Sequence, residues 1–284
     1  MNFNDVRAGR SSLASAAAAG LALCTFVLPA LGQSFTYSDT DMLLGFRQTG
    51  GATTVLVDLG PASQFYGAKA GSTFTVGNPA AISVATSRAF GGLSGLQYSI
   101  TGTLRSSANA NADHPIQTLW ASKESPDLNT SSDPWTRQSS FGLGNTAAKM
   151  QTMGNLAVSY GSVNVANIDA HTILIPSADG DSYSRWVGSG TTGNGAVGNF
   201  NNTFQGNVEG KTPAVFSGND SVRLDLYQVT PGSGDAQNLG YFRLNGAGSL
   251  TFTATSVPEP GTWALVGLGV FALVGASRRN GGNR

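Results

Sequence analysis

Apolar and polar residues alternate most clearly between residues 222 and 254. Residues 222–226 read Val-Arg-Leu-Asp-Leu, which is the period of two that a half-buried strand shows. Two more apolar runs follow, and segments rich in turn-forming residues separate the three: the runs are Leu239–Leu244 and Leu250–Ala254, and the turns are Pro231–Asp235 and Asn245–Gly248. We therefore predict an antiparallel meander of three strands, with the positive φ of a tight hairpin at Asn245-Gly246.

The preceding part of the chain shows more strands than helices. Strands are predicted at Met42–Phe46, Thr53–Leu59, Leu96–Leu104, Gln117–Ala121 and His171–Ile175. Two helices are expected: a short turn at Pro61–Tyr66, and Thr146–Leu156, capped by Asn145 and weakened by Gly154. We predict an all-β, antiparallel sandwich or jelly-roll-like body. Because the stretch Gly188–Asn202 resembles a linker, the sequence is compatible with either one large domain or two small domains.

Charged residues are scarce and unevenly placed. They make up 11% of the 284 residues, against roughly a quarter in an ordinary globular protein. The formal net charge is zero, but residues 33–257 carry 11 basic and 14 acidic side chains, and the two ends of the chain are basic. This composition argues against a nucleic-acid binder built on a basic face and against a heptad coiled coil.

The first 32 residues have the pattern of an export signal. Arg7 and Arg10 precede an uncharged apolar stretch, and Ala30 and Gly32 supply the small residues that signal peptidase requires before its cleavage site. The apolar stretch is also long enough for a membrane-anchoring helix. A third interpretation makes Cys24, the single cysteine, a lipidated N-terminus. Cleavage after Gly32 would leave a mature protein without cysteine, so disulfide and thiol chemistry are not expected.

The last 28 residues, 257–284, have a second distinctive pattern. Pro258, Glu259 and Pro260 precede an apolar run, Trp263–Ala276, and Arg278 and Arg279 follow it. As a helix this run of 14 residues spans about 21 Å at ~1.5 Å per residue, which is shorter than a ~30 Å hydrocarbon core. The terminal position and the basic end favour a short, temporary transmembrane helix over a helix of the core.

Together, the triplet, the helix and the arginine pair resemble a PEP-CTERM sorting signal. The resemblance implies export, transient anchoring in the inner membrane, recognition by an exosortase, and release or transfer to the cell surface of a bacterium that makes extracellular polysaccharide. Within residues 33–256, three further segments resemble a recurrent kind of PEP-CTERM passenger, for which no activity is assigned. These segments are Asp41–Arg47, Val57–Gly60, and Leu224–Tyr227 with Pro231–Gly234.

No catalytic constellation stands out in the body. The sequence has two histidines, His114 and His171. It contains neither a G-x-S-x-G elbow nor an H-E-x-x-H motif. Asp179 and Asp181 are the best calcium candidates, with Asp169 or Asp220 as further ligands, although Asp-Gly is also ordinary turn chemistry. We expect no cofactor other than this candidate calcium ion.

Five aromatic residues, Trp120, Trp135, Trp186, Tyr160 and Tyr183, provide either core packing or a face for stacking sugars, and Trp135 and Trp186 are the glycan-stacking candidates. The sequence predicts an exported, non-enzymatic surface or matrix protein associated with extracellular polysaccharide or a biofilm. A secreted hydrolase acting on glycans is the alternative, and it requires two close carboxylates that the sequence does not single out.

Overall fold

The computed structural model describes residues 34–136, 139–162, 167–187, 197, 208–232 and 234–255. The strands are β1 (Asp41–Arg47), β2 (Thr53–Pro61), β3 (Thr73–Val76), β4 (Gln97–Thr103), β5 (Leu119–Glu124), β6 (Asn167–Asp169), β7 (Thr172–Pro176), β8 (Gly210–Lys211), β9 (Ser221–Val229), β10 (Gln237–Asn245) and β11 (Leu250–Ala254). The helices are α1 (Ser63–Tyr66), α2 (Pro79–Phe90), α3 (Ser140–Gly161), α4 (Tyr183–Trp186) and the 3₁₀ turn η1 (Ser107–Asn109).

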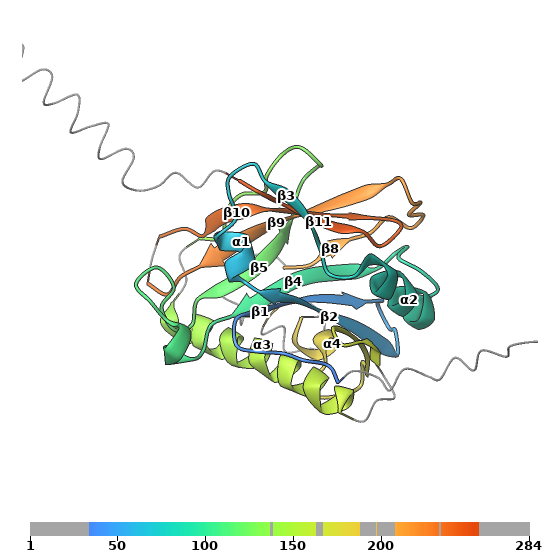
Figure 1. Ribbon diagram of the computed structural model, residues 1–284, viewed down its shortest axis with the longest axis horizontal. Helices are drawn as coiled ribbons and strands as arrows, with labels where there is room; N and C mark the ends of the chain where they lie inside the picture. The colour runs from blue at the N-terminus through green and yellow to red at the C-terminus, as the bar shows by residue number, and fades with distance from the viewer. Residues whose placement is uncertain are drawn as a thin grey trace, which may run out of the picture. The chain divides into compact units, whose positions relative to one another are not determined.

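The described strands form one antiparallel sheet. Ten of them follow the order β3-β11-β10-β9-β5-β4-β1-β2-β7-β6, and β8 pairs with β4. The sheet curls over, so that β3, β11 and β10 lie above β4, β1 and β2 in Figure 1. The all-β antiparallel prediction is confirmed, and the two layers are two parts of one hydrogen-bonded sheet.

The inner face of the curled sheet encloses an apolar core. Alternate residues of β1 and β2 point into it, and so do those of β9, β10 and β11 on the opposite side. Phe65 of α1 closes one part of this core, with its ring centroid 5.3 Å from that of Phe242 and 5.0 Å from that of Phe252. Because residues from both layers meet in one cluster, curling the sheet buries the apolar sides of both.

The outer face carries a second apolar cluster under two helices. Leu43, Leu56 and Tyr227 point outward from their strands and pack with residues of α3 and α4. Figure 1 shows α3 running beneath the β4–β1–β2 part of the sheet, with α4 beside it. The central strands are thus covered on both faces, which explains why all seven residues of β1 are buried.

The start of α3 differs from its prediction. The helix begins six residues earlier, and Ser139 rather than Asn145 caps it, accepting a hydrogen bond from the backbone N–H of Gly142 at 3.2 Å. Gly154 lies inside the helix and does not interrupt it. The ring of Tyr37 packs against this position, and a Cβ here would overlap that ring. The glycine lowers the local helix propensity but allows close packing of the N-terminal segment.

Three helical segments were not predicted: α2, α4 and the 3₁₀ turn η1. In α2, Asn78 caps the N-terminus through hydrogen bonds from the backbone N–H groups of Ala80 (3.1 Å) and Ala81 (3.4 Å), Pro79 is the first helical residue, and Gly91 ends the helix at φ +80°. These cap signals are present in the sequence. The helix has a weak apolar stripe of small residues, so hydrophobic periodicity alone does not reveal it.

Candidate functional site

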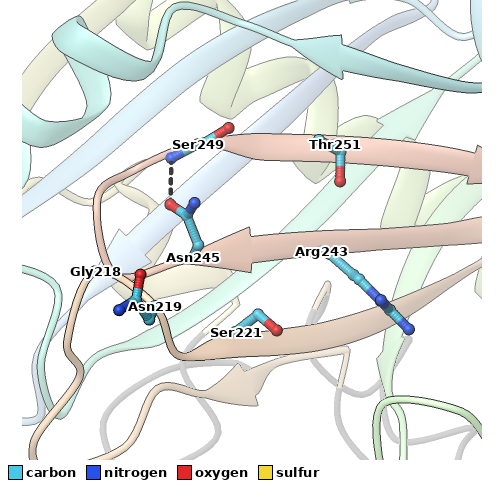
Figure 2. Close-up of a pocket in the computed structure, with 7 residues that line it drawn as sticks. All are labelled: Gly218, Asn219, Ser221, Arg243, Asn245, Ser249 and Thr251. Atoms are coloured by element: carbon cyan, nitrogen blue, oxygen red, sulfur yellow. Dashed lines mark hydrogen bonds between the residues drawn. The ribbon is translucent and has the colours of Figure 1, made fainter.

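A shallow polar depression lies at one end of the β9–β10–β11 meander (Figure 2). Its volume is about 320 Å³. Its lining residues are Gly218, Asn219, Ser221, Arg243, Asn245, Ser249 and Thr251. Strand alternation places Ser221, Arg243 and Thr251 on the same outward face of three neighbouring strands, since their neighbours Leu224, Phe242 and Phe252 point into the core.

Two turns form the rim of this depression. Asp220 accepts hydrogen bonds from the backbone N–H (2.9 Å) and hydroxyl (2.8 Å) of Ser217, and these bonds lower the pKa of its carboxyl group. Asn245 accepts hydrogen bonds from the backbone N–H groups of Ala247 (3.1 Å) and Ser249 (2.9 Å), the second of which Figure 2 draws. The rim is therefore ordered by its own side chains.

The predicted hairpin at Asn245-Gly246 exists, but its geometry is different. The positive φ of the turn occurs at Gly248 (+88°) and not at Asn245 or Gly246. Gly246 is needed for another reason, since a Cβ there would overlap the carbonyl oxygen of Ser217 on the neighbouring turn. Tertiary contact between the two turns, rather than hairpin conformation, selects glycine at this position.

Two arginines flank the ring of Tyr241 next to the depression. The guanidinium carbon lies 4.0 Å from the ring centroid for Arg223 and 5.4 Å for Arg243. Both arginines also donate to the carbonyl oxygen of Leu128, at 3.2 Å and 2.8 Å respectively. This part of the sheet is therefore tied to the loop that crosses it. A second depression of about 190 Å³ adjoins the first at Ser221, and Lys211 contributes to its lining.

The loop 125–136 is held across the outer face by a buried ion pair. Arg223 donates two hydrogen bonds to Oδ1 of Asp225, at 2.9 and 2.6 Å. The other oxygen, Oδ2, accepts from the backbone N–H (2.5 Å) and the hydroxyl (2.9 Å) of Ser132. The hydroxyl of Tyr227 also donates to the Ser132 carbonyl. With all these groups hydrogen-bonded, the charges are compensated in a site where Asp225 is fully buried.

A second buried ion pair lies under α4. Arg47 of β1 donates to both carboxylate oxygens of Glu209, at 2.7 and 2.6 Å. Tyr183 of α4 donates to Glu209 at 3.2 Å and shares a hydrogen bond with Ser99 at 2.8 Å. Burial raises the pKa of Tyr183, so its hydroxyl stays protonated. Gly45 allows this arrangement, because a Cβ at that position would overlap the Tyr183 ring.

A third group of polar residues contains two carboxyl groups. Asp41 and Asp58 are both largely buried, and Nδ1 of the exposed His171 lies 3.5 Å from Oδ2 of Asp58. Burial and the negative charge of Asp58 raise the pKa of Asp41 to about 6, while a hydrogen bond from the backbone N–H of Ser38 opposes the shift. Burial raises the pKa of Asp58 as well. These residues resemble an acid–base group more closely than any others in the described part of the chain.

The stacking prediction for Trp135 and Trp186 is wrong. Their side chains are 2% and 6% exposed, so neither presents a ring face to a sugar. Both belong to the outer apolar cluster, where Lys123 lies over the Trp135 ring (4.4 Å) and Lys149 over the Trp186 ring (4.1 Å). A polar sequence around a tryptophan does not establish its exposure, because the loop here folds back onto the sheet.

The calcium candidates are engaged in hydrogen bonds within a turn. Asp179 accepts from the hydroxyl of Tyr160 (3.0 Å) and from the backbone N–H of Asp181 (3.0 Å), and Asp181 accepts from the indole of Trp186 (3.2 Å). Within the described residues, no group of three or more His, Cys, Asp or Glu side chains is arranged to hold a metal ion. Asp179 thus takes part in a turn through its bond from Asp181, and calcium binding at Asp179 and Asp181 stays a prediction.

The other predicted residues lie elsewhere. His114 packs against Tyr66 in the loop before β5, with the ring centroids 4.1 Å apart and the ring planes tilted by 35°. The signal segment with Ala30 and Gly32, the sorting residues Pro258, Glu259, Pro260, Arg278 and Arg279, and most of Gly188–Asn202 are outside the described residues. Sequence reasoning did not single out Arg243, although it occupies a polar position in an alternating strand and was therefore recognisable as outward-facing.

The comparison with known protein families gives one match. The PEP-CTERM protein-sorting motif matches residues 256–279, which follow directly after the last described residue, Thr255. No curated protein and no solved structure is similar enough to this chain to match it. Among the described helices, none has the length and apolar character needed to cross a bilayer.

Proposed function

We propose that this chain, which carries a PEP-CTERM protein-sorting motif over residues 256–279, is a non-enzymatic surface or matrix protein that associates with extracellular polysaccharide or a biofilm. The motif supports export and sorting of the protein by an exosortase to the cell surface. In this proposal, signal peptidase cleaves after Gly32 and the C-terminal segment anchors the chain in the membrane until the exosortase acts near Pro258-Glu259-Pro260.

The polar depression supports the association with polysaccharide. Its lining consists of hydroxyl, amide and guanidinium groups, which are the partners that sugar hydroxyls use in hydrogen bonds. It is open and has few apolar contacts, as expected for a surface along which a polymer lies rather than for a pocket that encloses a small apolar ligand. The single observation that carries the proposal is the sorting motif, and the polar lining of the depression supports a polysaccharide as the ligand.

Intact mass and fractionation test the sorting step. In cells with an active exosortase, the surface-associated protein should lack Arg278 and Arg279, and replacing Pro258, Glu259 and Pro260 by alanine should leave the tail attached and the protein in the membrane fraction. Cells without the exosortase are the control. A surface form that retains the arginine pair in exosortase-positive cells would show that this sorting route is wrong.

Co-sedimentation tests the association. The released protein should sediment with polysaccharide purified from the producing cells, whereas an exported protein without such an affinity should stay in the supernatant. Equal recovery of both proteins in the supernatant would contradict the proposal. Removal of the C-terminal tail is measured separately, and its result does not depend on the outcome of the co-sedimentation.

The group Asp41–Asp58–His171 favours one alternative function, a secreted hydrolase acting on glycans. A carboxyl group with a pKa near 6 can serve as a general acid at neutral pH, and Asp58 would be its partner. The alternative predicts that the purified protein releases reducing ends from its polysaccharide and that Asp41→Asn abolishes this release. Equal, background-level release by both proteins would rule it out.

A further inference from the structure

Arg243 is insufficiently compensated in its surroundings. It forms no ion pair with any described residue, whereas Arg223, directly opposite it on β9, is neutralised by Asp225 at 2.6 Å. The Nε–H of Arg243 is also buried without a hydrogen-bond acceptor in the described structure. Both features leave a cation that an incoming anion would stabilise.

The surroundings of Arg243 limit the chemistry of such an anion. Among the described side chains that line the depression, Arg243 is the charged one, and the carboxylate of Asp220 lies at the rim, where it is bonded to Ser217. Ser221, Thr251 and Asn219 offer hydroxyl and amide groups within the same space, and these suit a ligand with many hydroxyls (Figure 2). The volume, about 320 Å³, is at the small end of the range for ligand sites.

The position of the depression suits a polymer. It adjoins the second depression at Ser221, and the lining of that depression includes the cations Lys211 and Arg223 as well as the carboxylates of Glu124 and Asp127. β11 begins beside the first depression and ends at Ala254, four residues before Pro258. The sorting segment continues from the C-terminal end of β11, and the depression lies at the other end of this strand. Binding of a polysaccharide at the depression therefore does not depend on the processed tail.

We propose that this depression binds an acidic glycan, with the carboxylate of a uronic acid residue paired to the guanidinium of Arg243 and the sugar hydroxyls bonded to Ser221, Thr251 and Asn219. A guanidinium matches a carboxylate with two parallel hydrogen bonds, which a neutral sugar cannot reproduce. The inference rests on the proposed association with polysaccharide and adds the class of sugar and the residue that selects it.

Calorimetric titration of the full chain with short oligogalacturonates tests the proposal. The wild type should bind the acid form at least ten-fold more tightly than the methyl-esterified form of the same length. Arg243→Gln should lose at least ten-fold in affinity for the acid form and little for the ester. Arg105→Gln, which removes an exposed arginine at the opposite end of the sheet, should stay within two-fold of the wild type.

A second variant separates binding from folding. Asn219 is exposed in the turn, so Asn219→Asp should leave the thermal midpoint unchanged and should lower the affinity for the acid form several-fold through repulsion. Equal affinities for acid and ester, an equal loss in Arg105→Gln, or displacement by inorganic phosphate at the same concentration would each overturn the proposal. If Arg243→Gln still co-sediments fully with the native polysaccharide, this inference fails while the proposed association stands.

Discussion

Apolar clusters bury both faces of the sheet, and the outer face adds two buried ion pairs. The inner core is built from aliphatic and aromatic side chains that meet when the sheet curls over, such as Phe65, Phe242 and Phe252. The outer face combines its apolar cluster with the pair Arg47–Glu209 beneath α4 and the pair Arg223–Asp225 beneath the loop 125–136. Hydrophobic burial is non-directional, whereas hydrogen-bonded ion pairs specify which segment docks and in what position.

The segments that cover the sheet limit the surface on which a ligand can bind. The inner face is closed, and the part of the outer face covered by α3 and α4 is closed as well. The meander β9–β10–β11 keeps an outward polar face with the first depression on it, and the second depression lies where β9 meets β5, β8 and the loop 125–136. Substitutions that affect the core, the fastening networks and this open face should therefore separate into distinct effects.

The largest effect is expected from the inner core. Phe252→Ala should lower the free energy of unfolding by about 4 kcal/mol, because it removes a fully buried ring in contact with Phe65 and Phe242 and leaves a cavity. Urea denaturation measures the change. Thr253→Ala, on the same strand but facing outward, should cost less than about 1 kcal/mol. Equal losses would mean that the two faces contribute alike.

The next effect is expected from the loop network. Asp225→Asn should cost about 3 kcal/mol, because it leaves Arg223 buried without an anion. Unlike Phe252→Ala, it should also make residues 125–136 sensitive to limited proteolysis under native conditions, since Ser132 loses its charged acceptor. The exposed Asp235→Asn is the matched control. Proteolysis of this loop at the wild-type rate would contradict the fastening role.

A smaller effect is expected at the contact between β1 and α4. Gly45→Ala should cost about 2 kcal/mol, because the added methyl group overlaps the Tyr183 ring and forces α4 away from the sheet. Gly180→Ala, at a position with no atom within 4 Å of the added carbon, should change the thermal midpoint little. A midpoint for Gly45→Ala as high as that of the control would show that α4 is not closely packed on β1.

A further effect concerns Asp41 and depends on pH. A pKa raised from 3.8 to about 6 means that the folded state favours the protonated carboxyl, so this contribution to stability is complete below pH 3.8 and is lost as the pH rises through 6. Asp41→Asn keeps the acceptor for Ser38 but does not titrate. The thermal midpoint of the wild type should therefore fall relative to that of Asp41→Asn between pH 4 and pH 7, and a constant difference would contradict the shift.

The sequence predicted the parts of this protein that depend on local pattern. Alternation located the meander of β9, β10 and β11, and turn-forming residues marked its connections. The order Pro-Glu-Pro, apolar run and arginine pair indicated the sorting motif, because an enzyme recognises it as a linear segment and no fold is needed to form it. The same local signals at Asn78-Pro79 and Gly91 marked α2, although the weak periodicity between them concealed it.

Only the tertiary structure decided what is buried and which charges pair. Trp135 lies in a polar stretch and is nevertheless covered, because its loop is fastened to β9 by Asp225. Arg47 and Glu209 are 162 residues apart, so their pairing depends on the order of the strands and on the position of α4. A strand pattern states which residues face outward, but the curling of the sheet and its covering segments decide which of those remain in water. Arg243 is one outward-facing residue that forms no ion pair with any described residue.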